Sequence, residues 1–137
     1  MAHILIIEDY RDNRDVAEFI LRDAGHSVTT AGNGLLGVQL ALRVQPDVIL
    51  MDLALPLLNG WEATQRLKAN PATCSIPVIA FTAHTTQEDI DHACAAGCAA
   101  IIAKPFEIPV FLTEVVAALA PAARHERQRA IGADWEA

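Results

Sequence analysis

Four short apolar runs in this sequence each end at, or just before, a polar residue whose side chain could carry chemistry. These residues are Glu8, Asp9, Asp52, Thr82 and Lys104. Three carboxylates brought together repel one another unless a cation holds them, and ligands that are all oxygen suit Mg²⁺ or Mn²⁺. Mg²⁺ uses only one or two carboxylates, which leaves a carboxylate oxygen able to act as a nucleophile in aspartyl-phosphate chemistry. A lysine and a hydroxyl would bind the oxygens of the phosphoryl group.

Each of these residues also has a plainer interpretation when it is taken alone. Glu8 and Asp9 could be acids at the entry to a helix, Asp52 a loop acid or helix cap, Thr82 a cap and Lys104 a solvated lysine. Polar residues at successive strand ends are hard to obtain by accident. The combination therefore favours a site.

The elements that must position these residues follow from the hydrophobic pattern. Short apolar runs predict strands at His3–Ile7, Ser27–Ala31, Val48–Met51 (with Asp52 at its carboxyl end), Pro77–Phe81 and Ala99–Ala103. Helical spacing of apolar residues, with caps and breakers, predicts helices at Asp12–Ala24, Leu35–Val44, Gly60–Lys68, Thr86–Ala96 and Ile108–Leu119. Five strands alternating with five helices indicate an α/β fold, a parallel sheet covered on both faces. In such sheets the sites lie at the carboxyl ends of the strands.

Composition sets the class of protein. The chain has 137 residues, of which 53% are hydrophobic and 20% charged, and this predicts one globular domain at residues 1–120. We interpret residues 121–137 as a polar tail or an extension of the last helix. The net charge of −7 disfavours direct binding to nucleic acid.

Neither a signal peptide nor a membrane-spanning run is visible, so we expect a cytoplasmic protein that does not bind a membrane. Reduced thiols would suit that compartment. Cys94 and Cys98 stand one helical turn apart with His92 nearby, which is a conceivable metal site. Small core residues are the favoured interpretation of the two cysteines.

Four segments together resemble the receiver domain of bacterial two-component response regulators. They are ILIIEDY, VILMDLALPLLNGWE, PVIAFTAH and AAIIAKPF, and the resemblance covers residues 1–119. It implies a three-layer, doubly wound, flavodoxin-like fold with strand order 2-1-3-4-5. It also implies that Asp52 is the phosphoacceptor, with Thr82 as the switch hydroxyl and Lys104 as the phosphate-binding lysine. The metal ligands would be Glu8, Asp9, Asp52 and the backbone carbonyl of Ala54.

The resemblance further implies the partners. A sensor histidine kinase or a histidine phosphotransfer protein would donate the phosphoryl group, in a reaction that the receiver itself catalyses with Mg²⁺. We expect a stand-alone signalling protein rather than an enzyme in the ordinary sense, because no effector domain follows Leu119. It would autocatalyse its own phosphorylation and dephosphorylation and signal to a downstream protein whose identity the sequence does not give. Dimerisation linked to phosphorylation stays open.

Three other functions compete with this one. A receiver-like interaction module that works without phosphorylation is the main alternative. A flavin mononucleotide (FMN) binder is disfavoured because Glu8 and Asp9 would repel its phosphate. A small aspartyl phosphatase usually needs an acid two residues after the nucleophile, where this chain has Ala54.

Some positions depart from the family pattern. Ile101 stands three residues before Lys104, where an aromatic residue is usual, and this predicts altered or weakened signalling through the fourth and fifth elements. Tyr10 replaces a common asparagine. Ala54 leaves the path of an attacking water open, whereas His84 could obstruct it.

Overall fold

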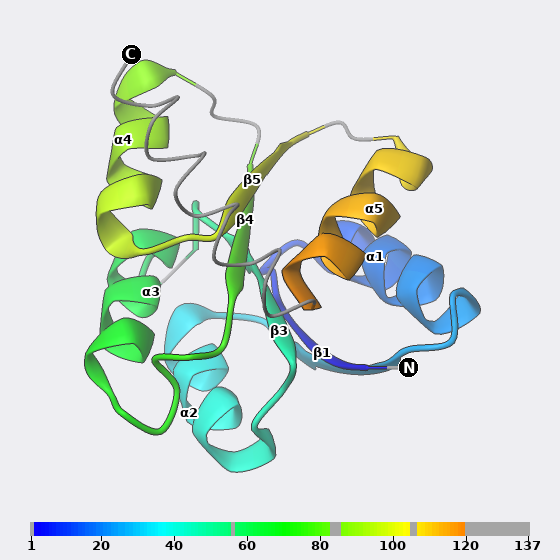
Figure 1. Ribbon diagram of the computed structural model, residues 1–137, viewed down its shortest axis with the longest axis horizontal. Coiled ribbons are helices and arrows are strands. Elements are labelled where there is room, and N and C mark those ends of the chain that lie inside the picture. The colour runs from blue at the N-terminus through cyan, green and yellow to red at the C-terminus, as the bar shows by residue number, and fades with distance from the viewer. Residues whose placement is uncertain (1, 56, 83–85, 105–106, 120–137) are drawn as a thin grey trace.

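Strands and helices alternate through the ranges that the computed structural model describes, residues 2–55, 57–82, 86–104 and 107–119 (Figure 1). The strands are β1 (His3–Ile7), β2 (Ser27–Ala31), β3 (Val48–Asp52), β4 (Val78–Thr82) and β5 (Ala100–Ala103). The helices are α1 (Arg11–Asp23), α2 (Gly34–Val44), α3 (Gly60–Ala69), α4 (Gln87–Ala96) and α5 (Ile108–Leu119). The predicted alternation of five strands and five helices is confirmed in these ranges.

All the strand pairings are parallel, and the order of the sheet is β2-β1-β3-β4-β5. This is the flavodoxin-like order that the resemblance implied. The register brings the carboxyl ends of neighbouring strands to one edge, because Ile7 pairs with Met51 and Asp52 pairs with Phe81. The predicted site residues therefore lie at or just after strand ends that are side by side.

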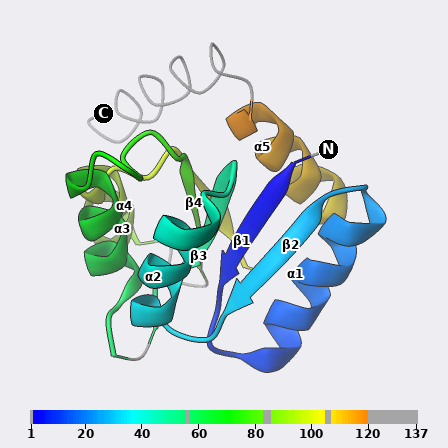
Figure 2. The same ribbon diagram turned by 90° about the horizontal axis from the view of Figure 1, so that it is seen from below.

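Helices cover both faces of the sheet. Figures 1 and 2 show α1 and α5 on one face and α2, α3 and α4 on the other. Successive side chains of a strand point to opposite faces. Ile4 and Ile6 accordingly join the core beside α1 and α5, whereas Leu5 and Ile7 join the core beside α2 and α3. Burial of each such side chain contributes about 1.5–3 kcal/mol, so the central strands form a rigid base for the site.

Local capping explains where several helices begin and end. The side chains of Asn33, Asn59 and Thr86 accept hydrogen bonds from backbone amides in the first turns of α2, α3 and α4. Gly25 follows α1 with φ of +95° and Gly97 caps α4 with φ of +102°, a backbone conformation that favours glycine.

The predicted boundaries need small corrections. Asp52 and Thr82 are the last residues of β3 and β4 rather than the first residues beyond them. Pro77 and Ala99 precede their strands. Helices α1, α2 and α3 begin or end one residue from the predicted positions, and α4 begins after its cap Thr86. Apolar periodicity locates the centre of an element better than the residue at which hydrogen bonding stops.

The cysteines are free thiols. Cys98 lies in the core, where burial raises the pKa of its thiol to about 12, so it stays protonated at neutral pH. Within the described ranges, no helix is long and apolar enough to cross a membrane. The predicted tail and His84 fall outside those ranges.

Candidate functional site

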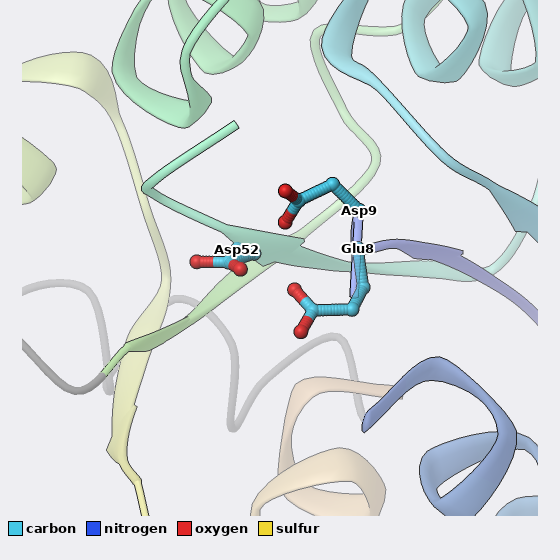
Figure 3. Close-up of side chains that lie close together, drawn as sticks. All are labelled: Glu8, Asp9 and Asp52. Carbon is cyan, nitrogen blue, oxygen red and sulfur yellow. The ribbon is translucent and has the colours of Figure 1, made fainter. Parts of the chain in front are cut away.

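Three carboxylates meet at the carboxyl edge of the sheet. Glu8 and Asp9 follow β1 directly, and Asp52 ends the neighbouring strand β3. One carboxylate oxygen from each residue lies within 4.8 Å of the other two, and Figure 3 shows the three side chains converging. Glu8 is buried and Asp52 is only 6% exposed, whereas Asp9 is open to solvent. In the described part of the chain, this is the one group of His, Cys, Asp and Glu residues that could hold a metal ion.

Lys104 brings a positive charge to these acids from the end of β5. Its Nζ lies 3.2 Å from Oε1 of Glu8 and 3.4 Å from Oδ2 of Asp52. The ammonium also lies 4.6 Å from the centroid of the Phe81 ring. The Lys104 side chain is only 17% exposed, so its ammonium is a largely buried positive charge beside the two acids.

Thr82 is the fifth predicted residue. It ends β4, the strand between those that supply Asp52 and Lys104, and it is 1% exposed. Its backbone carbonyl accepts a hydrogen bond of 2.8 Å from the amide of Lys104. The two residues are thus linked through their backbones at the edge of the sheet.

The loop after Asp52 folds back tightly over that residue. The amide of Ala54 donates to Oδ1 of Asp52 at 3.0 Å, and the amide of Gly60 donates to the carbonyl of Leu53 at 3.0 Å. A Cβ at Gly60 would lie 2.4 Å from the backbone oxygen of Asp52, so α3 can start this close only with glycine. The Ala54 carbonyl remains a predicted metal ligand.

Burial dominates the electrostatics of Glu8. Desolvation by burial, followed by the adjacent carboxylate of Asp52, raises the pKa of Glu8 to about 7 against the opposing effects of Asn13 and Lys104. At neutral pH the metal-free site therefore readily holds a proton on Glu8. Oε2 of Glu8 is buried and has no hydrogen-bond partner among the described residues.

This arrangement suits a hard divalent cation. Three oxygen donors lie within reach of one point, and one buried carboxylate oxygen lacks a donor. Mg²⁺ and Mn²⁺ prefer oxygen ligands of this kind, and binding would displace the proton. The donor set thus fits the predicted cofactor.

Sequence reasoning missed Asn13. It lies in the first turn of α1, and its Nδ2 donates to Oε1 of Glu8 at 3.0 Å. The next residue, Arg14, donates from Nη1 to the backbone carbonyl of Glu8 at 3.2 Å. A polar residue in the first turn of the helix after β1 is the signal that could have identified it, since that turn lies over the site edge.

Two of the positions that depart from the family pattern lie within the described residues. Ile101 pairs with Ala80 in the sheet and is partly buried against the core on the α2, α3 and α4 face. Tyr10 caps α1 in an extended conformation, is 58% exposed and makes no side-chain capping bond. How Ile101 changes signalling stays a prediction.

Comparison with known proteins identifies the family that this chain matches. The model of the response regulator receiver domain family matches residues 4–116. Protein PilH of Pseudomonas aeruginosa is 37% identical, with 88% of this chain aligned to 99% of PilH. The DNA-binding dual master transcriptional regulator RpaA of Synechocystis sp. is 36% identical over 87% of this chain, which spans only 49% of RpaA.

A similar solved structure contains a metal ion. The receiver domain of sensor histidine kinase PA1611 from Pseudomonas aeruginosa is 35% identical to this chain. The TM-score is 0.77, and the match covers 96% of this chain and 98% of that one. That structure holds a magnesium ion coordinated in its active site cleft.

Proposed function

The chain belongs to the response regulator receiver domain family, and from that premise we propose that Asp52 accepts a phosphoryl group from a phosphohistidine on a donor protein. Members of this family are signalling proteins that interact with histidine kinases and downstream effectors. The donor would be a sensor histidine kinase or a histidine phosphotransfer protein. The acceptor would then signal to a partner through a change of conformation.

The reaction uses the ionised carboxylate of Asp52 as a nucleophile. One of its oxygens forms a bond to phosphorus while the bond between phosphorus and the imidazole nitrogen of the donor breaks, and the imidazole leaves with the electron pair and takes up a proton. Glu8, Asp9, Asp52 and the Ala54 carbonyl would hold Mg²⁺ or Mn²⁺, which supplies neutralisation of the charge on the transferred group. Catalysis of this kind depends mostly on positioning and charge.

Lys104 and Thr82 act on the product. The Lys104 ammonium, which lies 3.2 Å from Glu8 and 3.4 Å from Asp52 in the unphosphorylated chain, would move to an oxygen of the new phosphoryl group. The Thr82 hydroxyl would donate a hydrogen bond to another. Because the amide of Lys104 is bonded to the carbonyl of Thr82, the ends of β4 and β5 would respond together. Such a local charge change can be read by a distant partner.

The observation that carries the proposal is the meeting of the three carboxylates with Lys104 at one edge of the sheet. Labelling with acetyl phosphate and Mg²⁺, followed by intact mass measurement, tests it. Asp52→Asn should abolish the added phosphoryl mass, and Asp23→Asn, which makes the same change at an exposed site at the end of α1, should not. Full labelling of the Asp52→Asn variant would refute the assignment.

Ile101 gives a specific reason to keep a second function in view. Its aliphatic side chain packs against the core at a position where the family usually has an aromatic residue. A receiver-like module that binds its partner independently of phosphorylation would show the same partner affinity before and after labelling. Under the proposed function, that affinity changes on labelling.

A further inference from the structure

Asn13 is an exposed residue of α1 that is nevertheless bonded to the acidic site. We propose that Asn13 is a positioning residue for the divalent cation, acting through the carboxylate of Glu8. The inference rests on the proposed function, because it assigns a role in the same cation site. Its basis is the hydrogen bond of 3.0 Å from Nδ2 of Asn13 to Oε1 of Glu8.

The backbone of Glu8 is already fixed from both sides. Its amide donates to the carbonyl of Ala31 in β2 at 3.0 Å, and its carbonyl accepts from Arg14 at 3.2 Å. The side-chain torsions of Glu8 are then the main freedom left to this ligand. Asn13 restricts them by holding one carboxylate oxygen.

Two donors share that oxygen, and they differ in what they do to a cation. Oε1 of Glu8 accepts from Asn13 at 3.0 Å and from Lys104 at 3.2 Å, which leaves the buried Oε2 without a donor among the described residues. The Lys104 ammonium repels a divalent cation and is shared with Asp52. Asn13 is neutral, so it orients the carboxylate while leaving its charge for the metal. In the proposed reaction Lys104 leaves for the phosphoryl group, and Asn13 is the donor that stays.

The thermal stability of the Asn13→Ala variant separates a role in cation positioning from a purely structural role in α1. Asn13 is exposed at the third position of α1, where alanine has the higher helix propensity. Asn13→Ala should therefore leave thermal stability unchanged or slightly raised. A loss of cation affinity in a variant that melts no lower cannot come from damage to the helix.

The experiment is calorimetric titration of Mg²⁺ into the full chain, comparing wild type, Asn13→Ala and a control, Gln39→Ala. The control removes a side-chain amide from an exposed position of α2. Loss of a residue that orients a metal ligand typically weakens metal binding by about 10–100-fold, and for an exposed donor we expect about tenfold. The control should bind as wild type does. A Kd for Asn13→Ala within about twofold of wild type would overturn the inference.

A double variant tests whether the effect passes through Glu8. In a Glu8→Ala background there is no carboxylate to orient, so adding Asn13→Ala should change the Kd by less than about twofold. An undiminished tenfold loss there would refute positioning through Glu8. If Glu8→Ala does not fold, the labelling assay decides instead. Asn13→Ala should raise the Mg²⁺ concentration for half-maximal labelling by about tenfold and leave the rate at saturating Mg²⁺ unchanged, and an unchanged Mg²⁺ requirement would overturn the inference.

The two proposals fail in different ways. A wild-type chain that binds no Mg²⁺ and takes no phosphoryl group would refute the proposed function and this inference together. A wild type that binds Mg²⁺ and is labelled, with Asn13→Ala indistinguishable from it, would refute the inference alone.

Discussion

Replacing Glu8 by glutamine should stabilise the metal-free chain, and more so as the pH rises. Glutamine has nearly the same shape and keeps an oxygen that can accept from Asn13 and Lys104. It cannot ionise. The substitution thus isolates the cost of placing a charged carboxylate in this buried position beside Asp52.

The sign and size of the effect follow from the pKa of Glu8. Folding raises that pKa from 4.5 to about 7, chiefly by burial. Below pH 4.5 the carboxyl group is protonated in both the folded and the unfolded chain, so the favourable contribution of the neutral group is fully present. As the pH rises through about 7, the folded group must ionise and that contribution is lost. Each pKa unit corresponds to about 1.4 kcal/mol, so the ionised carboxylate lowers the free energy of unfolding by about 3 kcal/mol at pH 8.

Urea unfolding in EDTA at pH 5, 6, 7 and 8 measures this effect. The stability of Glu8→Gln minus that of wild type should increase across the series, by about 3 kcal/mol at most. Saturating Mg²⁺ should reverse the order at pH 8, because the cation binds the ionised carboxylate of the folded wild type. A stability difference that is flat from pH 5 to pH 8 in EDTA would refute this account of Glu8.

Two further substitutions test the site from other sides. Lys104→Met keeps the aliphatic stem over Phe81 but removes the ammonium, so Mg²⁺ should bind about fivefold tighter at low salt, as expected for about 1 kcal/mol of lost repulsion. Calorimetry checks this, and weaker binding would contradict it. Gly60→Ala places a Cβ 2.4 Å from the backbone oxygen of Asp52, and urea unfolding should show a loss of about 1–3 kcal/mol. As a control, the exposed substitution Gln39→Ala should change the free energy of unfolding by less than about 0.5 kcal/mol. Equal stabilities of the two variants would contradict the prediction, because the loop after Asp52 would then accommodate the added Cβ without cost.

The sequence was sufficient to predict the architecture because the apolar runs of two central strands, β3 and β4, are strong signals. β3 and β4 are buried along their whole length, and such strands appear in a sequence as unbroken apolar runs. Parallel strands then place their carboxyl ends at a common edge. That edge explains why Glu8 and Asp52, far apart in the chain, could be predicted to meet.

The finer features depend on geometry that a linear pattern does not carry. Asn13 reaches Glu8 across the turn from β1 into α1, a contact between residues five positions apart that matches neither a strand nor a helix period. The raised pKa of Glu8 depends on how completely the surrounding elements exclude water. Thr82 lies inside its strand because pairing continues to Ala103, and hydrophobicity does not report where pairing ends.

The charges around Asp52 suggest how the site passes from one state to the next. In the metal-free chain the acids are balanced by the Lys104 ammonium and by a proton that Glu8 holds up to about pH 7. A divalent cation would displace the proton, and a phosphoryl group would then draw Lys104 away from Glu8. Since the Lys104 amide is bonded to the Thr82 carbonyl, that displacement would act directly on the ends of β4 and β5. We therefore expect the backbone of these two strands, rather than a rotating side chain at Ile101, to transmit the signal in this receiver.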